Sequence, residues 1–334
     1  MQAVDQTISD IPRSQALANL LKSAGDPLRI EILRALAQDS YGVLELSHIF
    51  DTRQNGMSHH LKVLANAGLV DTRREGNSIF YRRSTPHQSN ETSIDELDLT
   101  RAMLFDSIDL TTLPKIVEER IVEIHEQRSL TSTQFFAEHG SSLKEKQDLI
   151  AAFEVYGDQV SNFIEHTHLK HSNRVLEIGP GDGQFLPLLS GKFSQVFALD
   201  NSQTMLESAR EFCKSASQTN IDFILSDTSW CQQHVNYVDC VVINMVLHHT
   251  PSPQQIFSDV SATLNSEGIL IVCELCNHNQ DWTRKACGDL WLGFEPKDLT
   301  QWASAAGLNE GQSSYFALRN GFQIQIREFI KPYI

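Results

Sequence analysis

A glycine-rich turn and a downstream aspartate carry the clearest chemical signal in the sequence. The apolar run 175–178 is followed by Gly179, Gly181 and Gly183 in a Gly-x-Gly-x-Gly pattern. Glycines in such a turn let the backbone approach a ligand without a Cβ in the way. The next apolar run ends in Asp200, where a carboxylate can accept hydrogen bonds from both hydroxyls of a ribose. The spacing therefore predicts a site for a nucleotide-containing cofactor.

A second set of polar side chains lies near the N-terminus, in a region with the rhythm of a helix-turn-helix. Asp26-Pro27 is a typical helix start, and helices are also expected over 14–24, 43–50 and 54–66. Two basic strands flanking Glu75-Gly76-Asn77 predict a hairpin, the wing of a winged helix. The helix over 54–66 would then enter the DNA major groove, while the wing would cross phosphates. Residues placed for base edges are Gln54, Asn55, Ser58, His59 and His60, and those placed for phosphates are Lys62, Arg73 and Arg74. The alternative is that these side chains only form the solvated face of a small helical domain.

The same region resembles the ArsR family of bacterial winged-helix repressors. The resemblance covers about residues 14–84 and rests on GDPLRIEILRAL, MSHHLKVLANAGLV and TRREGNSIFYRR. It implies binding to a double-stranded DNA operator as a homodimer. Many members sense metals through two cysteines, but Gly42 and Leu44 stand at the matching positions here. Neither residue can ligate a soft metal, so thiolate metal sensing at that position is not expected.

The second half of the chain alternates predicted strands with helices, which is typical of a doubly wound parallel sheet. After the first two strands, the third is followed by Asp227, the fourth ends in Asn244, and the fifth ends in Glu274. Two further strands, over 313–318 and 322–327, flank Asn320-Gly321, a strong hairpin signal. A mostly parallel, Rossmann-like sheet closed by a C-terminal antiparallel hairpin looks like the class I methyltransferase fold. Dinucleotide binding remains the alternative for the glycine-rich turn.

Residues 174–334 as a whole resemble S-adenosylmethionine-dependent methyltransferases, and WLGFEPKDLTQWASAAGL resembles those fused behind ArsR-type domains. The implied cofactor is S-adenosylmethionine or S-adenosylhomocysteine. By that resemblance, the contacts to the cofactor come from Glu177, Gly179, Gly181, Gly183, Asp200, Asn201, Asp227, Thr228 and Asn244. The alternative for Glu177 and Asp227 is a structural carboxylate at the end of a strand.

The candidates for catalysis are His248, His249 and Glu274, just beyond the fourth and fifth strands. Methyl transfer needs mainly an aligned nucleophile within about 3 to 3.5 Å, and a base if the nucleophile is protonated. Related methyltransferases often carry a histidine at this place. A pair of histidines can equally serve packing, and that alternative stays open.

All six cysteines lie in the second half of the sequence, at positions 213, 231, 240, 273, 276 and 287. Their mostly apolar surroundings suit small buried side chains in a reducing compartment, so disulfides are not expected. Cys273-x-x-Cys276 with Cys287 suggests metal binding, but Cys273 falls within a strand, where residues i and i+3 point to opposite faces. Buried packing is favoured, and no metal site is predicted.

Length and charge set the domain organisation. The 334 residues are enough for two or three domains, and the composition, 41% hydrophobic and 21% charged, is typical of a folded soluble chain. The net charge is −15, yet residues 1–84 carry +1, and 48–83 carries an excess of +3 that includes Arg82 and Arg83. Without a signal peptide or an apolar stretch long enough to span a bilayer, we expect a cytoplasmic protein that does not enter a membrane. The expected domains are a winged helix over 1–84, a linker and helical connector over 85–147, and a methyltransferase domain over 148–334. In the connector, a long helix is expected over 112–139.

Two functions of different classes follow. In the first, the chain is a bacterial DNA-binding transcriptional regulator whose methyltransferase-type domain binds the cofactor as an effector. In the second, it is an active methyltransferase acting on a small molecule, with the winged helix as a targeting or regulatory module. The fourth strand runs into Asn244-Met-Val-Leu and not into an Asn-Pro-Pro-Tyr tetrad, which weighs against methylation of nucleic acid bases.

Overall fold

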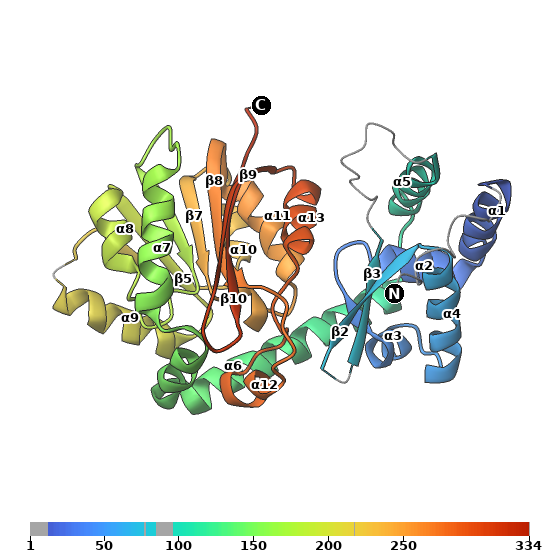
Figure 1. The fold of residues 1–334 in the computed structure, drawn as a ribbon, viewed down its shortest axis with the longest axis horizontal. Helices are drawn as coiled ribbons and strands as arrows, with labels where there is room; N and C mark the ends of the chain where they lie inside the picture. Colours follow the sequence, from blue (N-terminus) through green and yellow to red (C-terminus); the bar gives the residue numbers. More distant parts are fainter. Residues whose placement is uncertain (1–12, 77, 85–95, 217, 334) are drawn as a thin grey trace, which may run out of the picture. The chain divides into compact units, whose positions relative to one another are not determined.

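The fold of this chain, in a computed structural model, consists of two compact units that divide between His125 and Glu126 (Figure 1). The structure describes residues 13–76, 78–84, 96–216 and 218–333. Residues 85–95, the core of the expected linker, lie outside this described part. Helix α6 (Lys115–Ala151) is 37 residues long, begins in the first unit and ends in the second. It replaces the shorter helix expected over 112–139.

The first unit is a winged helix-turn-helix. Its helices are α1 (Arg13–Ala24), α2 (Pro27–Ala35), α3 (Val43–Ile49), α4 (Gln54–Asn66) and α5 (Glu96–Asp109), and its strands are β1 (Tyr41–Gly42), β2 (Val70–Glu75) and β3 (Ser78–Arg83). Asp26 caps α2, because its side chain accepts a hydrogen bond from the backbone N–H of Arg29 at 3.1 Å. The three strands form an antiparallel sheet in the order β1-β3-β2. Strand β1 has only two residues, and the sequence pattern did not predict it.

One apolar core holds this unit together. Met57, Leu61 and Leu64 of α4 are fully buried in it, at the helical spacing that turns one face of α4 inward. Phe105 of α5 and Val117 of α6 belong to the same core. The start of α6 is therefore an integral part of the winged-helix unit.

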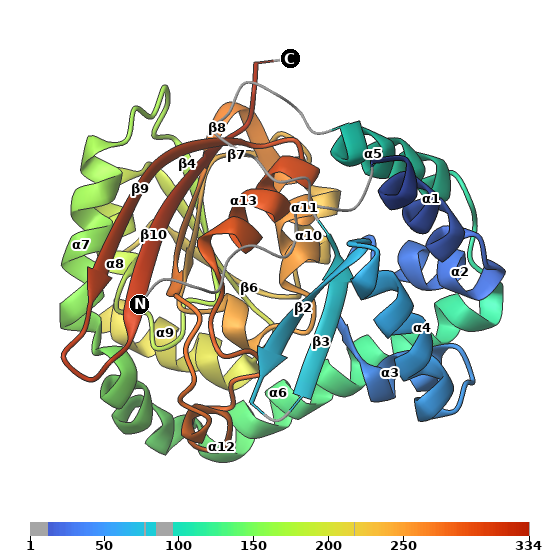
Figure 2. The same ribbon diagram turned by 45° about the vertical axis from the view of Figure 1, so that its right-hand side comes forward.

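The second unit is built on a seven-stranded sheet in the order β6-β5-β4-β7-β8-β10-β9 (Figure 2). Its strands are β4 (Arg174–Ile178), β5 (Gln195–Asp200), β6 (Ile221–Leu225), β7 (Val238–Asn244), β8 (Leu264–Leu275), β9 (Asn309–Ala317) and β10 (Gln323–Ile330). The first five are parallel to one another, and β10 runs antiparallel to both β8 and β9. The expected doubly wound sheet with a C-terminal antiparallel hairpin is confirmed.

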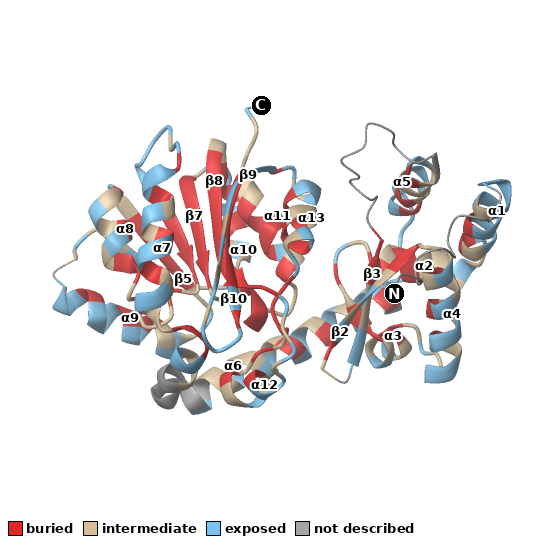
Figure 3. Ribbon diagram, viewed as in Figure 1, coloured by how far each residue is buried: buried red, intermediate tan, exposed pale blue. Residues whose placement is uncertain are grey.

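Helices cover both faces of this sheet. Its remaining helices are α7 (Phe153–His166), α8 (Leu186–Lys192), α9 (Gln203–Ser215), α10 (Ser229–Gln233), α11 (Pro253–Thr263), α12 (Trp282–Cys287), α13 (Pro296–Ala305) and the short 3-10 helix η1 (Leu247–His249). Helices α7, α8 and α9 lie on one face, and α10, α11 and α13 on the other (Figures 1 and 2). The central strand β7 is consequently buried along its whole length, and β4 and β8 are buried except near their first residues (Figure 3).

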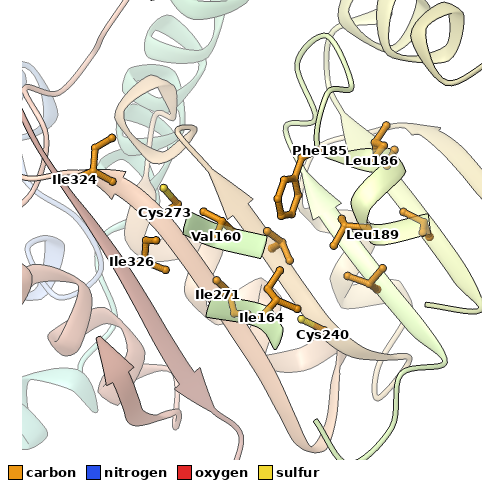
Figure 4. Packing of buried hydrophobic residues seen from close by; sticks show 14 of the residues in the cluster. Val160, Ile164, Phe185, Leu186, Leu189, Cys240, Ile271, Cys273, Ile324 and Ile326 are labelled. Atoms are coloured by element: carbon orange, nitrogen blue, oxygen red, sulfur yellow. The ribbon is translucent and has the colours of Figure 1, made fainter. Parts of the chain in front are cut away.

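Figure 4 shows the packing on the first of these faces. Val160 and Ile164 of α7 lie against Ile271 of β8, and Leu186 and Leu189 of α8 belong to the same cluster. Cys240 and Cys273 are part of this core as well. All six cysteines of the chain are buried and free, as the sequence predicted.

Strand β10 shows a feature that its alternating pattern did not predict. Gln325 and Arg327 are as buried as Ile324 and Ile326, with which they alternate. The Arg327 guanidinium donates to the Pro296 carbonyl at 2.9 Å and to Thr300 Oγ1 at 2.7 Å, and it pairs with Glu310 at 2.5 Å. The pattern is therefore that of a strand covered on both faces, one of them by a polar network.

Within the described part of the chain, no helix combines the length and the apolar composition that crossing a membrane requires.

Candidate functional site

The carboxyl ends of β4 and β7 bring Glu177 and Asn244 together. Asn244 Nδ2 donates to Glu177 Oε1 at 3.3 Å, and both side chains are buried. Burial raises the pKa of Glu177 to about 8, although the hydrogen bond from Asn244 lowers it. The other carboxyl oxygen of Glu177 and the amide oxygen of Asn244 are buried without a hydrogen-bond partner. Two unpaired buried acceptors at the edge where doubly wound sheets bind ligands indicate a ligand that donates hydrogen bonds.

The glycine-rich turn after β4 lies next to this pair, and its three glycines all have positive φ. A Cβ at Gly179 would lie 2.6 Å from Val246, and one at Gly183 would lie 2.9 Å from the backbone of Ala209 in α9. A Cβ at Gly181 would meet nothing within 4 Å. Gly179 and Gly183 therefore permit close packing, while Gly181 borders open space.

Asp200 lies at the end of β5, the strand next to β4. Its Oδ1 accepts a hydrogen bond from the Ser202 backbone at 2.8 Å. Burial raises the pKa of Asp200 to about 6, and backbone hydrogen bonds from Ser202 and Asn201 lower it. Asn201 itself is exposed.

Asp227 and Thr228, expected near an adenine, take part in local structure. Asp227 is exposed and accepts a hydrogen bond from the Ser229 backbone at 2.9 Å, at the start of α10. Thr228 Oγ1 donates to Asp259 of α11 at 2.5 Å. Their contact with a cofactor stays a prediction.

The three catalytic candidates lie together beyond β7 and β8. His248 Nδ1 donates to Glu274 Oε1 at 2.6 Å, and both side chains are almost completely buried. Burial lowers the pKa of His248, but the Glu274 and Asp289 carboxyl groups outweigh this effect and raise the pKa to about 9. Burial and the charge of His248 lower the pKa of the adjacent His249 to about 3.

Asp289, in the loop after α12, completes this cluster, although the sequence pattern did not point to it. Its Oδ1 lies 3.6 Å from His249 Nδ1 and 3.9 Å from His248 Nε2. Asp289 is in a loop, where the sequence has no periodicity. The only sign of its importance in the sequence is that a charged residue stands within a largely apolar segment.

Helix α6 packs over this cluster. The Phe136 ring contacts the His249 ring edge-on, with centroids 5.0 Å apart. A Cβ at Gly288, whose φ is +78°, would lie 2.3 Å from Phe135. Near the start of the second unit, the Arg128 guanidinium lies over the Trp291 ring and donates to the Pro251 carbonyl at 2.9 Å. The helix that begins in the winged-helix core thus holds the loop that carries Asp289.

In the first unit, α4 presents the side chains expected to contact base edges. Gln54, Asn55, Ser58 and His59 are exposed, and His60 is half-buried. Lys62, expected to contact a phosphate, is exposed as well. Direct contact with DNA stays a prediction for each of them.

The wing separates its arginines into exposed and buried ones. Arg74 is exposed and donates to the Gly76 carbonyl at 3.1 Å. Arg73 pairs at 2.7 Å with Glu75, with only 12% of the arginine side chain and none of the glutamate exposed. Arg83 forms two hydrogen bonds of 2.9 Å to Asp109. Since Arg82 is also buried, the basic face expected over 48–83 is smaller than its charge count implied.

Two family models match the chain, one in each unit. The model described as a bacterial regulatory protein of the arsR family matches residues 26–72, and the model described as a methyltransferase domain matches residues 176–272. This chain joins an ArsR-type helix-turn-helix domain to a methyltransferase-type domain. The two expected resemblances, to the ArsR family in residues 14–84 and to methyltransferases in residues 174–334, are therefore confirmed by models that match within these ranges.

Individual relatives match only one of the two domains. The ArsR-type domain is 46% identical over 70 residues to the biofilm growth-associated repressor of Agrobacterium fabrum, a match that covers 21% of this chain and 60% of that protein. It is 26% identical over 90 residues to a transcriptional repressor SmtB homolog of Synechocystis, covering 27% of this chain and 68% of that protein. The methyltransferase-type domain is similar to the crystal structure of a SAM-dependent methyltransferase of Methanosarcina mazei, at 18% identity and a TM-score of 0.43, covering 51% of this chain and 98% of that one. The first match thus spans less than two thirds of the Agrobacterium protein.

Proposed function

We propose that this protein is a DNA-binding transcriptional regulator whose methyltransferase-type domain binds S-adenosylmethionine or S-adenosylhomocysteine as an effector. The ArsR-type domain supports DNA binding, and the exposed side chains of α4 supply groups for base contacts. In this family, a dimer on a two-fold operator is the expected form.

The residues of the methyltransferase-type domain fit such a cofactor. Glu177 and Asn244 keep unpaired buried acceptors for the amino group of its amino-acid part, and the open side of Gly181 leaves room beside them. Asp200 would accept hydrogen bonds from the ribose hydroxyls. When bound, S-adenosylmethionine supplies a methyl group on a positively charged sulfur, a charge that S-adenosylhomocysteine lacks. The ionisation of the buried Glu177 carboxyl group would differ between the two ligands, because a positive charge nearby favours the carboxylate form.

The observation that carries the effector role is the continuity of α6. Val117 and Ile124 of this helix are buried in the core of the first unit, while Ile150 and Ala151 are buried in the core of the second. Between them, Phe136 contacts His249 beside the candidate site. A ligand that changes the packing around α6 would therefore change a helix that both cores share. Such a ligand acts as an effector only if it binds the DNA-competent and DNA-incompetent states with different affinity.

Reciprocal titration tests this proposal. A labelled promoter fragment is titrated with the full-length protein without ligand, with S-adenosylmethionine and with S-adenosylhomocysteine, and calorimetry then measures each ligand on free and DNA-bound protein. One ligand is expected to change DNA affinity roughly 5- to 150-fold, and DNA must change the affinity of that ligand by the same factor. Unchanged affinities in both directions would reject the effector role.

The second candidate function is methyl transfer to a small molecule. It is favoured by the His248–Glu274 pair, a histidine oriented by a buried carboxyl group at the ligand-binding edge of the sheet. Because its pKa is about 9, this histidine is protonated near neutral pH and can accept a proton from a methyl acceptor only at higher pH. Formation of S-adenosylhomocysteine on addition of acceptors from several chemical classes would support this activity, and no formation with any of them would reject it. A wild-type rate equal to that of His248→Gln would reject the role of His248.

A further inference from the structure

Three buried side chains beyond β7 and β8 place potential metal ligands around one point. His248, His249 and Asp289 each offer one ligand atom, and these atoms all lie within 4.8 Å of one another. Asp289 Oδ1 is 3.6 Å from His249 Nδ1 and 3.9 Å from His248 Nε2. Metal bonds to such atoms measure about 2.0 to 2.2 Å, so tetrahedral ligand atoms are roughly 3.4 Å apart. The two distances to Asp289 are close to this value. His249 Nδ1 also lies 3.4 Å from the Gly288 carbonyl oxygen, a contact that a bound metal would replace.

Glu274 prepares His248 for this role. A histidine that binds a metal through one nitrogen commonly donates its other N–H to a carboxylate, which fixes the tautomer and the ring orientation. His248 Nδ1 donates to Glu274 Oε1 at 2.6 Å, which leaves Nε2 directed toward Asp289. Glu274 is itself held by the backbone N–H of Leu275 at 2.6 Å. This arrangement of carboxylate, histidine and open position is the one that surrounds bound zinc in many proteins.

Three further polar atoms of the cluster lack hydrogen-bond partners, although the imidazoles of His248 and His249 lie within ion-pair distance of Asp289. Both carboxyl oxygens of Asp289 and Nε2 of His249 are buried without a hydrogen bond. Asp289 is 3% exposed and His249 is 7% exposed. Burying a carboxylate is unfavourable unless it is paired with a cation or coordinates a metal. His278 adds a third imidazole nearby: burial lowers its pKa to about 4, the Asp289 and His248 charges act on it in opposite directions, and its buried Nε2 has no hydrogen-bond partner.

We propose that His248, His249 and Asp289 bind one divalent transition-metal ion of the zinc class, with Glu274 orienting His248. Two imidazoles and one carboxylate favour Zn²⁺, Co²⁺, Ni²⁺ or Fe²⁺ over Mg²⁺ and Ca²⁺, which prefer oxygen ligands. Three protein ligands leave one tetrahedral position for water or for a donor atom of a small molecule. The proposal stands independently of the effector role, because it rests on these four side chains alone.

The test uses the full-length, tag-free protein after treatment with a chelator. Co²⁺ and Zn²⁺ are the probes, Mg²⁺ is the comparison, and binding is followed by calorimetry and by the visible ligand-field bands of Co²⁺. We expect one equivalent of Co²⁺ or Zn²⁺ to bind, with no saturable binding of Mg²⁺ at the same concentrations. Absence of saturable Co²⁺ and Zn²⁺ binding to the folded wild-type protein would overturn the proposal.

Variants then locate the ion. Asp289→Asn should weaken binding at least 100-fold, whereas Asp281→Asn, which changes an exposed carboxylate in the same segment, should leave binding unchanged. Glu274→Gln keeps an acceptor for His248 but removes the charge, and outer partners of this kind typically contribute 10- to 100-fold to metal affinity. If Asp289→Asn does not fold, as judged by circular dichroism, His249→Gln takes its place with the same expected loss.

The cysteines provide the competing explanation for bound metal. A thiolate ligand gives Co²⁺ an intense near-ultraviolet charge-transfer band, which a site of nitrogen and oxygen ligands lacks. We expect no such band. Such a band would show that a cysteine binds the ion, and equal Co²⁺ affinity in wild type and Asp289→Asn would show that Asp289 does not. Either result would overturn the proposal.

Discussion

The chain contains two adjacent histidine pairs, one in each unit, and their surroundings differ completely. His59 and His60 lie on α4 of the ArsR-type domain, where His59 is exposed and His60 half-buried. His248 and His249 lie on η1 of the methyltransferase-type domain, where both are buried beside carboxyl groups. The same dipeptide therefore forms a solvated surface in one unit and a charged interior in the other.

The contrast shows that burial decides whether a polar side chain contributes to the stability of the fold or to the binding of an external partner. In the interior, a shared environment splits the pKa values of neighbouring histidines to about 9 and about 3. An exposed histidine instead remains available for an external partner such as the edge of a base. Changes to the buried pair should therefore act on stability, and changes to the exposed pair should act on DNA binding.

The largest effect is expected from His248→Ala. It leaves the Glu274 carboxyl group buried without its imidazole, and removing one member of a buried pair typically costs about 3 to 5 kcal/mol. Urea unfolding followed by circular dichroism measures both variants, because all four tryptophans, at positions 230, 282, 291 and 302, belong to the second unit and their fluorescence does not report on the first. His59→Ala serves as the control and should stay within about 0.5 kcal/mol of wild type. If both variants lost the same free energy of unfolding, the buried and the exposed histidine pairs would not differ in their contribution to stability.

A second prediction extends the comparison to a buried carboxyl group. The pKa of Glu177 in the folded protein, about 8, lies above its ordinary value of 4.5, so its contribution to stability is complete below pH 4.5 and is lost as pH rises toward 8. Glu177→Gln cannot ionise, so it should stabilise the ligand-free protein at pH 7 by at most about 3 kcal/mol, at 1.36 kcal/mol per pH unit. Urea unfolding at pH 5 and pH 7 measures the difference, with exposed Glu207→Gln as the control. If Glu177→Gln were no more stable than wild type at pH 7, burial of the Glu177 carboxyl group would not destabilise the fold as its raised pKa predicts.

Much of the fold was predictable because it follows from local rules. The bounds of α4, the cap of α2, the wing and the parallel strands all came from helical spacing, a capping residue, a glycine-containing turn and apolar runs. The two-residue strand β1 was missed because so short a segment has no periodicity. The burial of Gln325 and Arg327 was missed because alternating polar residues are typical of a solvated face. Only the fold shows that the Phe294 carbonyl accepts from Gln325 and that α13 and Glu310 supply the partners of Arg327.

The candidate site was predictable where residues follow strands. Glu177, Asn244, His248 and Glu274 were found because parallel strands bring their carboxyl ends to one edge. Asp289 was not, because its position depends on a loop held by Phe135 against Gly288. The pairing of Arg73 with Glu75 was also missed, since a charge count cannot tell a buried arginine from an exposed one.

A third prediction concerns the cofactor. Asp200→Ala removes the acceptor for the ribose hydroxyls, which should weaken binding by about 1.5 to 3 kcal/mol and therefore at least tenfold. Calorimetry with S-adenosylhomocysteine measures the change. The control is Asp222→Asn, an exposed carboxylate on neighbouring β6, which should bind as wild type does. If Asp200→Ala and wild type bound S-adenosylhomocysteine with equal affinity, the ribose would not bind at the end of β5.

The exposed histidine pair provides the fourth prediction. His59→Ala should weaken binding to the specific operator by about 1 to 3 kcal/mol if it removes one base contact, and it should leave binding to unrelated DNA nearly unchanged. Fluorescence anisotropy with both DNA fragments measures the two affinities. An equal loss on both fragments would assign His59 to the phosphate backbone.

The smallest effect is expected in the wing, where two adjacent arginines repeat the contrast between exposed and buried residues. Exposed Arg74 is free to contact a phosphate, so Arg74→Ala should weaken binding to all DNA sequences alike and reduce the slope of log K against log salt by about 0.9. Arg73 is held by Glu75, so Arg73→Ala should instead destabilise the wing by removing one member of a buried pair. Anisotropy at several salt concentrations, with circular dichroism melting of both variants, separates the two effects. If Arg73→Ala changed the salt slope while its melting temperature stayed at the wild-type value, its ion pair would have to open on DNA, and burial in the free protein would no longer predict which arginine meets a phosphate.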